Sequence, residues 1–316
     1  MNPPATPFWL HNGRANTLFA KSLQAKPPAY RRELLPNRTG HTQIAYDFLD
    51  GADPAAPLVV LFHGLEGSSR SHYAIELMKA VHQKGWHGVV AHSPGCGGVP
   101  NTLTIPDHSG ETREMAFALE TLAARYPKIY AVGVSLGGNK LAKYLGEQGR
   151  LKKTAVPYAA ASVSAPVDLT ECSYRFDHGM TRLLYTRHFL SSVIPKARHF
   201  SSFHETVPLS SCKTIGEFDD VFTVPLHGFA DRYDYYRQAS SKPYLRDVAT
   251  PLLLLNARND PFLPGEALPT AEEVSPGVTL MQTPYGGHVG FTDQSGGHLN
   301  IRWLPQTLLD YFSRFE

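Results

Sequence analysis

The sequence predicts an α/β protein in which helices flank a mostly parallel central sheet and a helical cap is inserted between two of its strands. Two observations lead to this prediction. Short apolar runs alternate with amphipathic stretches, and one long segment, 169–245, interrupts the alternation. Strands that are buried on both faces show unbroken apolar runs, which is typical of parallel sheets covered by helices. We therefore assign residues 1–168 and 246–316 to a core and 169–245 to a cap.

The core elements are expected in a regular order. Residues 31–50 are expected to form two antiparallel strands at one edge, whereas short apolar runs predict buried strands at 58–62, 88–91, 128–133, 159–163, 250–256 and 278–282. Apolar residues at helical spacing predict helices around 74–81, 111–125, 139–147 and 304–315. In such sheets ligands bind at the carboxyl ends of the strands, so functional residues should follow strands directly.

The segment 169–245 has no clear strand and helix rhythm. It is rich in Phe, Tyr, His and Ser, as the run FADRYDYY at 229–236 illustrates. A structureless loop of this length is implausible inside a compact domain. We therefore expect short helices that pack as a cap over the strand ends.

Composition excludes several classes of function. The chain has 316 residues, with 30 Lys and Arg against 28 Asp and Glu, a net charge of +2. This balance gives no electrostatic reason to expect nucleic acid or an anionic membrane as the main partner. Cys96, Cys172 and Cys212 form neither a CxxC pair nor a zinc pattern, so we expect no disulfide framework, no metal and no cofactor.

The sequence also shows no segment typical of a signal peptide or of a membrane span. No apolar run is long enough to span a bilayer, and the first residues, MNPPATPFWLHNGR, do not show a basic stretch followed by an apolar one. We therefore expect a protein without a transmembrane segment in a reducing, cytoplasmic compartment. Oligomeric state is left open by the sequence.

The strongest motif is Gly133-Val134-Ser135-Leu136-Gly137-Gly138. An apolar run that predicts a strand precedes it, and a predicted helix follows directly. A serine on a sharp turn between a strand and a helix has an exposed hydroxyl, and glycines on either side permit close approach of the two elements. The helix N-terminus behind Ser135 offers unpaired N–H groups to a developing anion. Ser135 is therefore the candidate nucleophile.

A serine hydroxyl needs a histidine to accept its proton and an acid to orient that histidine. His288 follows the predicted strand at 278–282 in a glycine-rich loop, so it is the candidate base; His298, nearer the last helix, is the alternative. Asp260 follows the predicted strand at 250–256 and is the candidate acid. Asp168, after the predicted strand at 159–163, remains a competing acid.

Backbone donors for an oxyanion are expected at two strand ends. The loop HGLEGS at 63–68 follows the first buried strand, and it is of the type that supplies one N–H group, with the second coming from the residue after the nucleophile. These donors would be Leu65 and Leu136. We expect His63 to hydrogen-bond within this loop rather than to transfer protons, and we expect Cys96 to be structural.

These motifs resemble those of the α/β-hydrolase superfamily, and within it those of the bacterial YheT-like branch, which is related to eukaryotic abhydrolase-domain proteins and to yeast medium-chain ethyl-ester synthases. The matching pieces span nearly the whole chain: FWLHNGR at 8–14, HGLEGS at 63–68, GVSLGGN at 133–139, NARNDPF at 256–262 and GGHVGF at 286–291. The resemblance implies an α/β-hydrolase fold, a triad of Ser135, Asp260 and His288, and carboxylic-ester chemistry.

The sequence therefore predicts a serine carboxylic-ester hydrolase that acts on a small-molecule ester with a short or medium acyl chain. Transfer of the acyl group to an alcohol or a thiol, as in an acyltransferase or a thioesterase, would use the same residues. A ligand-binding member of the fold without catalysis is a third reading, because a fold alone does not establish activity.

Overall fold

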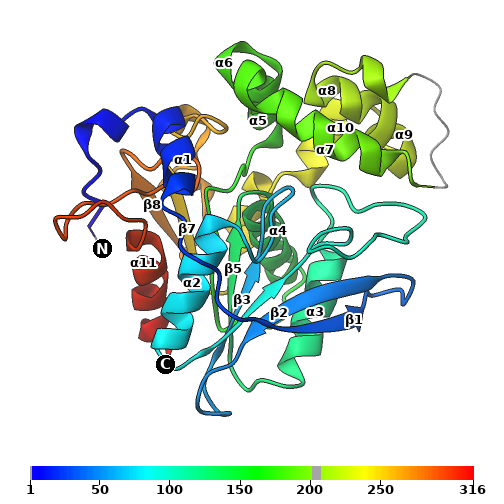
Figure 1. Ribbon diagram of the computed structural model, residues 1–316. Coiled ribbons are helices and arrows are strands. Elements are labelled where there is room, and N and C mark those ends of the chain that lie inside the picture. Colours follow the sequence, from blue (N-terminus) through cyan, green and yellow to red (C-terminus); the bar gives the residue numbers. More distant parts are fainter. Residues whose placement is uncertain (1, 201–207) are drawn as a thin grey trace.

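An eight-stranded sheet runs through residues 2–200 and 208–316, which are the residues that this computed structural model describes (Figure 1). Its strands are β1 (Arg31–Pro36), β2 (Gln43–Leu49), β3 (Leu58–Phe62), β4 (His87–Ala91), β5 (Ile129–Val134), β6 (Ala159–Val163), β7 (Leu252–Ala257) and β8 (Val278–Thr283). Their order across the sheet is β1-β2-β4-β3-β5-β6-β7-β8. The predicted α/β class with a mostly parallel sheet is confirmed.

Strand register places the functional loops at one edge of the sheet. β1 pairs with β2 and β2 pairs with β4 in antiparallel fashion, as expected for residues 31–50, whereas β4, β3, β5, β6, β7 and β8 run parallel. Phe62 on β3 lies opposite Gly133 on β5, and Gly133 lies opposite Ser162 on β6. The three central strands therefore end at the same level, and the loops that follow them meet.

Helices cover both faces of the sheet. On one face, α2 (His72–Gln83) packs with α11 (Trp303–Phe312), whose end continues as η8 (Ser313–Phe315) (Figure 1). On the other face, α3 (Arg113–Ala123) packs with α4 (Leu136–Arg150). Each helix presents buried apolar residues at helical spacing, which is what the sequence pattern predicted. Two apolar cores thus sandwich the sheet and fix its strand ends.

A helix that the sequence pattern did not predict lies near the N-terminus. A short turn, η1 (Phe8–Leu10), leads into α1 (Gly13–Ser22), and Asn12 caps α1 by accepting the N–H groups of Arg14 and Ala15. The residues that α1 buries are small or polar, namely Gly13, Asn16, Thr17 and Ala20. An apolar stripe, the usual signal of an amphipathic helix, is therefore missing from this segment.

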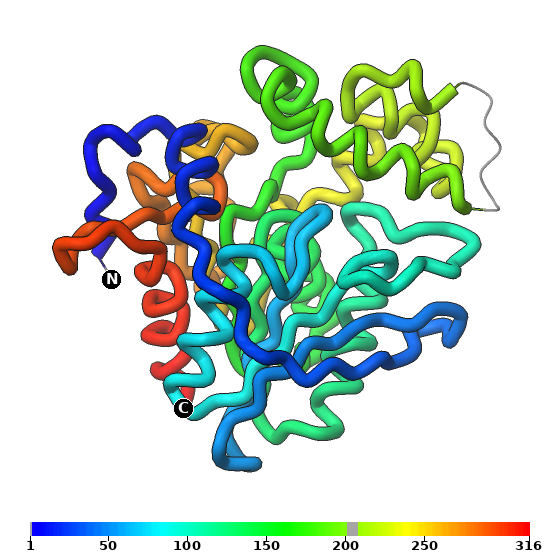
Figure 2. Tube along the Cα trace, viewed as in Figure 1, coloured from blue at the N-terminus to red at the C-terminus, as the bar shows by residue number. Residues whose placement is uncertain are grey.

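Short helices fill the stretch between β6 and β7. They are α5 (Leu169–Asp177), α6 (Gly179–Thr181), η2 (Arg182–Thr186), α7 (Arg187–Ala197), η3 (Leu209–Ser211), α8 (Ile215–Phe218), η4 (Asp219–Thr223), α9 (Val224–His227), α10 (Arg232–Ala239) and η5 (Lys242–Asp247). Figures 1 and 2 show most of them gathered above the sheet, at the end where β5 leads into α4. Residues 201–207 of the predicted cap lie outside the described residues.

These helices have an apolar cluster of their own, which includes Leu190, Phe218 and Phe222. The return to the sheet begins at η5, where Tyr244 packs against Gly146 of α4 and Leu245 joins the core. Between β7 and β8 the chain forms only two short turns, η6 (Gly265–Ala267) and η7 (Ala271–Glu273). Among the helices of the described residues, none is both long and apolar enough to cross a membrane.

Candidate active site

Ser135 sits on a tight turn between β5 and α4. Its φ of 54° places a non-glycine residue in the left-handed region, which is a strained conformation. The close approach of β5 and α4 depends on glycine. A Cβ on Gly133 would lie 2.4 Å from the Gly137 carbonyl oxygen, and a Cβ on Gly137 would lie 2.3 Å from the Phe62 carbonyl oxygen. The turn therefore holds the Ser135 hydroxyl out at the carboxyl edge of the sheet.

α4 begins at Leu136, three residues before the predicted start at Asn139. Glycine has a low intrinsic helix propensity, so the pair Gly137-Gly138 suggested a turn rather than a helix. Tertiary packing overrides this preference, because a Cβ on Gly137 would lie 2.3 Å from the Phe62 carbonyl oxygen and one on Gly138 would lie 2.9 Å from Ser162 Oγ. The first turn of α4 consequently stands directly behind Ser135, with its unpaired N–H groups facing the strand edge.

His288 and Asp260 complete a hydrogen-bonded chain with Ser135. The Nε2 atom of His288 is 2.9 Å from Ser135 Oγ, and its Nδ1 atom is 2.9 Å from Asp260 Oδ2. Asp260 is 5% exposed, and its other carboxylate oxygen accepts the N–H of Phe262 at 2.8 Å. The structure thus brings together the three residues that the sequence singled out, although they lie up to 153 positions apart.

The loop that carries His288 is held by residues that the sequence analysis missed. Thr17 on α1 accepts the backbone N–H of His288 at 2.7 Å, and Asn259 accepts that of Gly287 at 2.9 Å. Space is tight as well, since a Cβ on Gly287 would lie 2.4 Å from the Gly13 carbonyl oxygen. Asn259 could have been suspected from its place beside Asp260, whereas no local pattern marks Thr17.

The alternative acid and base lie elsewhere. Asp168 is the N-cap of α5, where its carboxylate accepts the N–H groups of Thr170 and Glu171. His298 is exposed in the loop before α11. Neither residue lines the cavity that contains Ser135. Of the competing residues, the structure therefore places only Asp260 and His288 in hydrogen-bond contact with each other.

The two expected oxyanion donors flank the serine. Leu136 is the first residue of α4. Leu65 follows Gly64, and a Cβ on Gly64 would lie 2.8 Å from the Cβ of Ser135. Both leucines line the same cavity as Ser135. His63 hydrogen-bonds within the adjoining loops, with Nδ1 2.7 Å from the Gly64 carbonyl oxygen and Nε2 accepting the Ser93 N–H at 3.2 Å. Burial lowers the pKa of His63 to about 4, so this ring is neutral at neutral pH.

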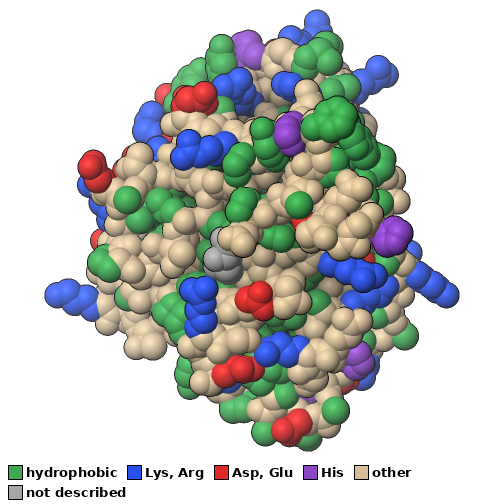
Figure 3. Space-filling model, turned by 90° about the vertical axis from the view of Figure 1, so that its left-hand side faces the viewer, with side chains coloured by type: hydrophobic (Ala, Val, Ile, Leu, Met, Phe, Trp, Pro, Cys, Tyr) green, Lys and Arg blue, Asp and Glu red, His purple; other side chains and the backbone are tan. Residues whose placement is uncertain are grey.

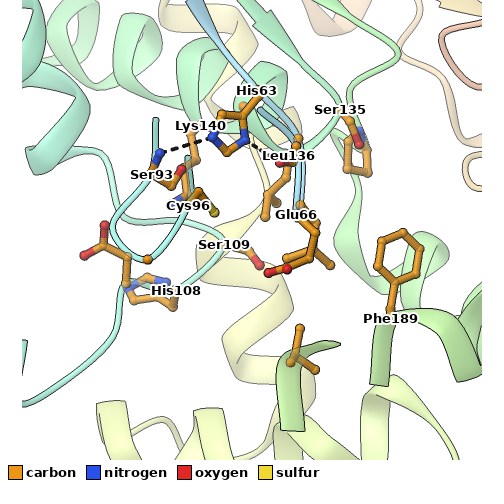
Figure 4. A pocket seen from close by; sticks show the side chains of 18 of the residues that line it. His63, Glu66, Ser93, Cys96, His108, Ser109, Ser135, Leu136, Lys140 and Phe189 are labelled. Atoms are coloured by element: carbon orange, nitrogen blue, oxygen red, sulfur yellow. Dashed lines mark hydrogen bonds between the residues drawn. The ribbon is translucent and has the colours of Figure 1, made fainter. Parts of the chain in front are cut away.

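A cavity of about 870 Å³ lies between the sheet edge and the helices above it. Figure 4 shows Ser135 and Phe189 toward one side of it and His63, Cys96, His108 and Lys140 toward the other. Phenylalanine and tyrosine rings from the upper helices line much of the wall, and burial raises the pKa of the Cys96 thiol. A thiol with a raised pKa is a poor nucleophile, in line with a structural role.

Aromatic rings link the histidine to the helices above it. The ring of Phe262 lies 4.3 Å from that of His288, and Tyr185 and Phe176 lie 4.8 Å and 4.7 Å from Phe262. This layer shields the His288 and Asp260 pair from solvent. Within residues 2–200 and 208–316, no group of three or more His, Cys, Asp or Glu side chains is arranged to hold a metal ion.

The sheet order and the serine turn define the class of protein. The chain belongs to the α/β-hydrolase superfamily, because the family model described as alpha/beta hydrolase fold matches residues 57–294. Its relatives agree. It is 39% identical over 285 residues to the Escherichia coli protein named "Putative esterase YheT", covering 85% of this chain and 82% of that protein. The resemblance to the YheT-like branch is confirmed.

Relatives from eukaryotes are also similar. Human phospholipase ABHD3 is 33% identical, with 90% of this chain and 72% of that protein covered, and a monoacylglycerol lipase of Saccharomyces cerevisiae is 27% identical over 97% of this chain and 72% of its own length. Among solved structures, the Pyrococcus furiosus esterase Pf2001 superposes with a TM-score of 0.60 at 14% identity, covering 92% of this chain and 97% of that one. This likeness shows the fold.

Proposed function

We propose that the protein is a serine carboxylic-ester hydrolase that uses Ser135, His288 and Asp260 as its catalytic triad. One observation carries the proposal: the unbroken hydrogen-bonded chain from Asp260 through His288 to a serine on a strained turn. A neutral imidazole between a carboxylate and a hydroxyl can accept a proton from the hydroxyl while the carboxylate stabilises the resulting cation.

The reaction follows from this geometry. Ser135 Oγ attacks the acyl carbon of the ester, and its proton passes to His288 Nε2 over the 2.9 Å hydrogen bond. The tetrahedral intermediate collapses as His288 returns the proton to the leaving alcohol, which leaves an acyl-enzyme. Water then attacks the acyl carbon, gives a proton to His288 and releases the acid, and the proton returns to Ser135.

Two further groups stabilise charge in this scheme. Asp260 holds the Nδ1–H of His288 and so fixes the ring in the tautomer whose Nε2 accepts a proton. The backbone N–H groups of Leu65 and Leu136 donate to the oxyanion of the tetrahedral intermediate. In other hydrolases, loss of one such donor lowers kcat by about 10²- to 10³-fold.

The cavity supports an apolar acyl group as the bound part of the ester. Apolar atoms make up most of its wall, and its volume of about 870 Å³ lies in the upper part of the range for small-molecule sites. The helices of the segment 169–245 contribute many of the side chains in this wall, so we propose that this segment is a cap over the site. The esterase and lipase names of the relatives support ester chemistry.

Labelling with a fluorophosphonate probe tests the nucleophile. The unaltered protein is expected to be labelled at Ser135 and to hydrolyse 4-nitrophenyl esters, while Ser135→Ala loses both properties. Esterase activity in Ser135→Ala equal to that of the unaltered protein would overturn the proposal. Assays over a series of acyl-chain lengths define the preferred substrate, and product analysis with and without added alcohol separates hydrolysis from acyl transfer.

The two aspartates provide a matched comparison for the acid. Asp260→Asn is expected to lower kcat by about 10⁴-fold, because the amide favours the wrong histidine tautomer. Asp168→Asn should leave kcat unchanged, since asparagine caps a helix about as well as aspartate. Similar activity in both variants, with both folded by circular dichroism, would remove Asp260 from the proposed triad.

A further inference from the structure

One face of the helices above the sheet is exposed and apolar. α6, η2 and α7 follow one another without a break from Gly179 to Ala197. On this stretch Met180, Leu183 and Leu184 are 52%, 73% and 45% exposed. Their spacing of three and four residues places them on the same side of a helix. Exposed apolar side chains that cluster in this way mark interaction sites more often than isolated ones do.

Basic side chains accompany these apolar residues. Arg182 and Arg187 are exposed on the same stretch, and no carboxylate of the described residues forms an ion pair with either. Asp177 is the only acidic residue between positions 174 and 200, and it is turned inward, toward the Gly216 N–H and Arg232. Figure 3 shows green apolar and blue basic side chains side by side across the top of the molecule, the region of these helices. We call Met180, Arg182, Leu183, Leu184 and Arg187 the apolar–basic face.

Local charge on this face differs from the charge of the whole chain. The net charge of +2 gave no reason to expect an anionic surface as a partner. That sum includes many acidic residues on other elements, whereas the face itself carries two arginines and no acid. Because charges further apart than about 8 Å are largely screened at physiological salt, a partner that touches the face responds to the local charge.

A layer of aromatic rings, formed by Tyr185 and Phe262, separates the apolar–basic face from His288. Tyr185 follows Leu184 in η2, yet it is buried, with its ring 4.8 Å from that of Phe262. Phe262 in turn packs 4.3 Å from the His288 ring. η2 is a single turn of π-helix, a rare form that occurs often at functional sites. Its side chains point both outward from the molecule and inward to the cavity wall.

We propose that the apolar–basic face is a docking surface for an anionic lipid bilayer. Met180, Leu183 and Leu184 would enter the boundary between headgroups and acyl chains, and Arg182 and Arg187 would lie beside lipid phosphates. This combination of long apolar side chains with arginines is that of helices that bind in the plane of the bilayer surface. The inference does not rest on the proposed catalytic function, so Ser135→Ala is expected to bind vesicles as the unaltered protein does.

Charge also favours a bilayer over a second copy of the chain. A two-fold dimer built on this face would bring the face against itself. Arg182 and Arg187 of one copy would then meet the same arginines of the other, and no acidic residue of the face would neutralise them. An anionic bilayer supplies the opposite charge instead.

Vesicle flotation tests the proposal with the full-length protein. Vesicles of phosphatidylcholine containing phosphatidylglycerol are compared with vesicles of phosphatidylcholine alone, at low and at high salt. We expect binding to the anionic vesicles, a decrease of about fivefold in the partition coefficient for Arg182→Gln or Arg187→Gln, and about tenfold for Leu183→Gln. High salt should remove most of the effect of the arginines.

Leu151→Gln is the matched control, because Leu151 is 61% exposed at the far end of α4. It is expected to bind vesicles like the unaltered protein, and the variants at positions 151, 182, 183 and 187 should keep their turnover of a soluble ester. Equal vesicle binding by Leu183→Gln and Leu151→Gln would overturn the proposal. So would equal binding to neutral and anionic vesicles, or self-association in analytical ultracentrifugation that Leu183→Gln abolishes.

Discussion

Replacing Thr17 by valine tests how the histidine loop is held in place. Thr17 is 4% exposed, and its Oγ1 accepts the backbone N–H of His288 at 2.7 Å and donates to the Gly13 carbonyl at 2.7 Å. Valine has nearly the same shape but no oxygen, so Thr17→Val leaves a partly buried N–H unpaired. Such a loss costs about 1 to 3 kcal/mol.

The loop can recover part of this free energy by moving so that the N–H reaches water. Movement draws His288 away from Ser135, so the loss appears in kcat rather than in KM. With about 1.4 kcal/mol for each factor of ten, we expect kcat on a soluble ester to fall by about fivefold to a hundredfold. Unfolding temperature should decrease as well, by a few degrees.

Thr17→Ser is the control for this experiment. Serine keeps the hydroxyl and loses only a methyl group, so it should retain most of the kcat while losing a similar or smaller amount of stability. Steady-state kinetics with both variants, together with thermal unfolding, decide the question. If folded Thr17→Val has the same kcat as Thr17→Ser, the hydrogen bond to His288 does not position the ring, and the reasoning fails.

Two other perturbations concern the helices above the site. Burial raises the pKa of Asp219 to about 6, so between about pH 4 and pH 6 the folded protein binds a proton that the unfolded chain releases. Stability should therefore fall as pH rises through this range, by up to about 1.4 kcal/mol per pH unit, and urea unfolding of Asp219→Asn should lack this slope. Glu66, next to Leu65, pairs with Lys196 of α7 at 2.7 Å. This ion pair is expected to hold the loop that carries Leu65 against α7. Glu66→Gln should therefore lower kcat about two- to fivefold at low salt and leave it equal to that of the unaltered protein in 1 M salt. A difference that persists in 1 M salt would refute this role of the ion pair.

Much of the core could be predicted from the sequence because its signals are local. β3 and β6 have the predicted bounds, since a short apolar run between turn residues leaves little choice in a buried strand. The placement of Ser135, Asp260 and His288 could also be predicted. Each follows a parallel strand, and the carboxyl ends of such strands lie at one edge of the sheet.

What could not be predicted depends on contacts between distant segments. α1 buries Asn16 and Thr17 against the loop of residues 286–292, and polar residues at such positions look like the exposed side of a helix. The exposed Leu183 is the opposite case, because an apolar residue in a helix of a folded domain is expected to be buried. For Asn16 and Thr17 the loop against which they pack, rather than the polarity of the side chain, decides that they are buried.

The hydrogen bond between Thr17 and His288 joins residues 271 positions apart. During synthesis, α1 leaves the ribosome long before the loop that it supports has been made. The turn at Ser135 needs only residues up to β6, whose Val163 carbonyl accepts the Ser135 N–H at 2.8 Å, whereas His288 reaches its place only when β8 has joined the sheet and the loop has met α1. A nascent chain therefore carries Ser135 without His288 beside it, and the hydrogen-bonded chain of Ser135, His288 and Asp260 is completed only late in folding.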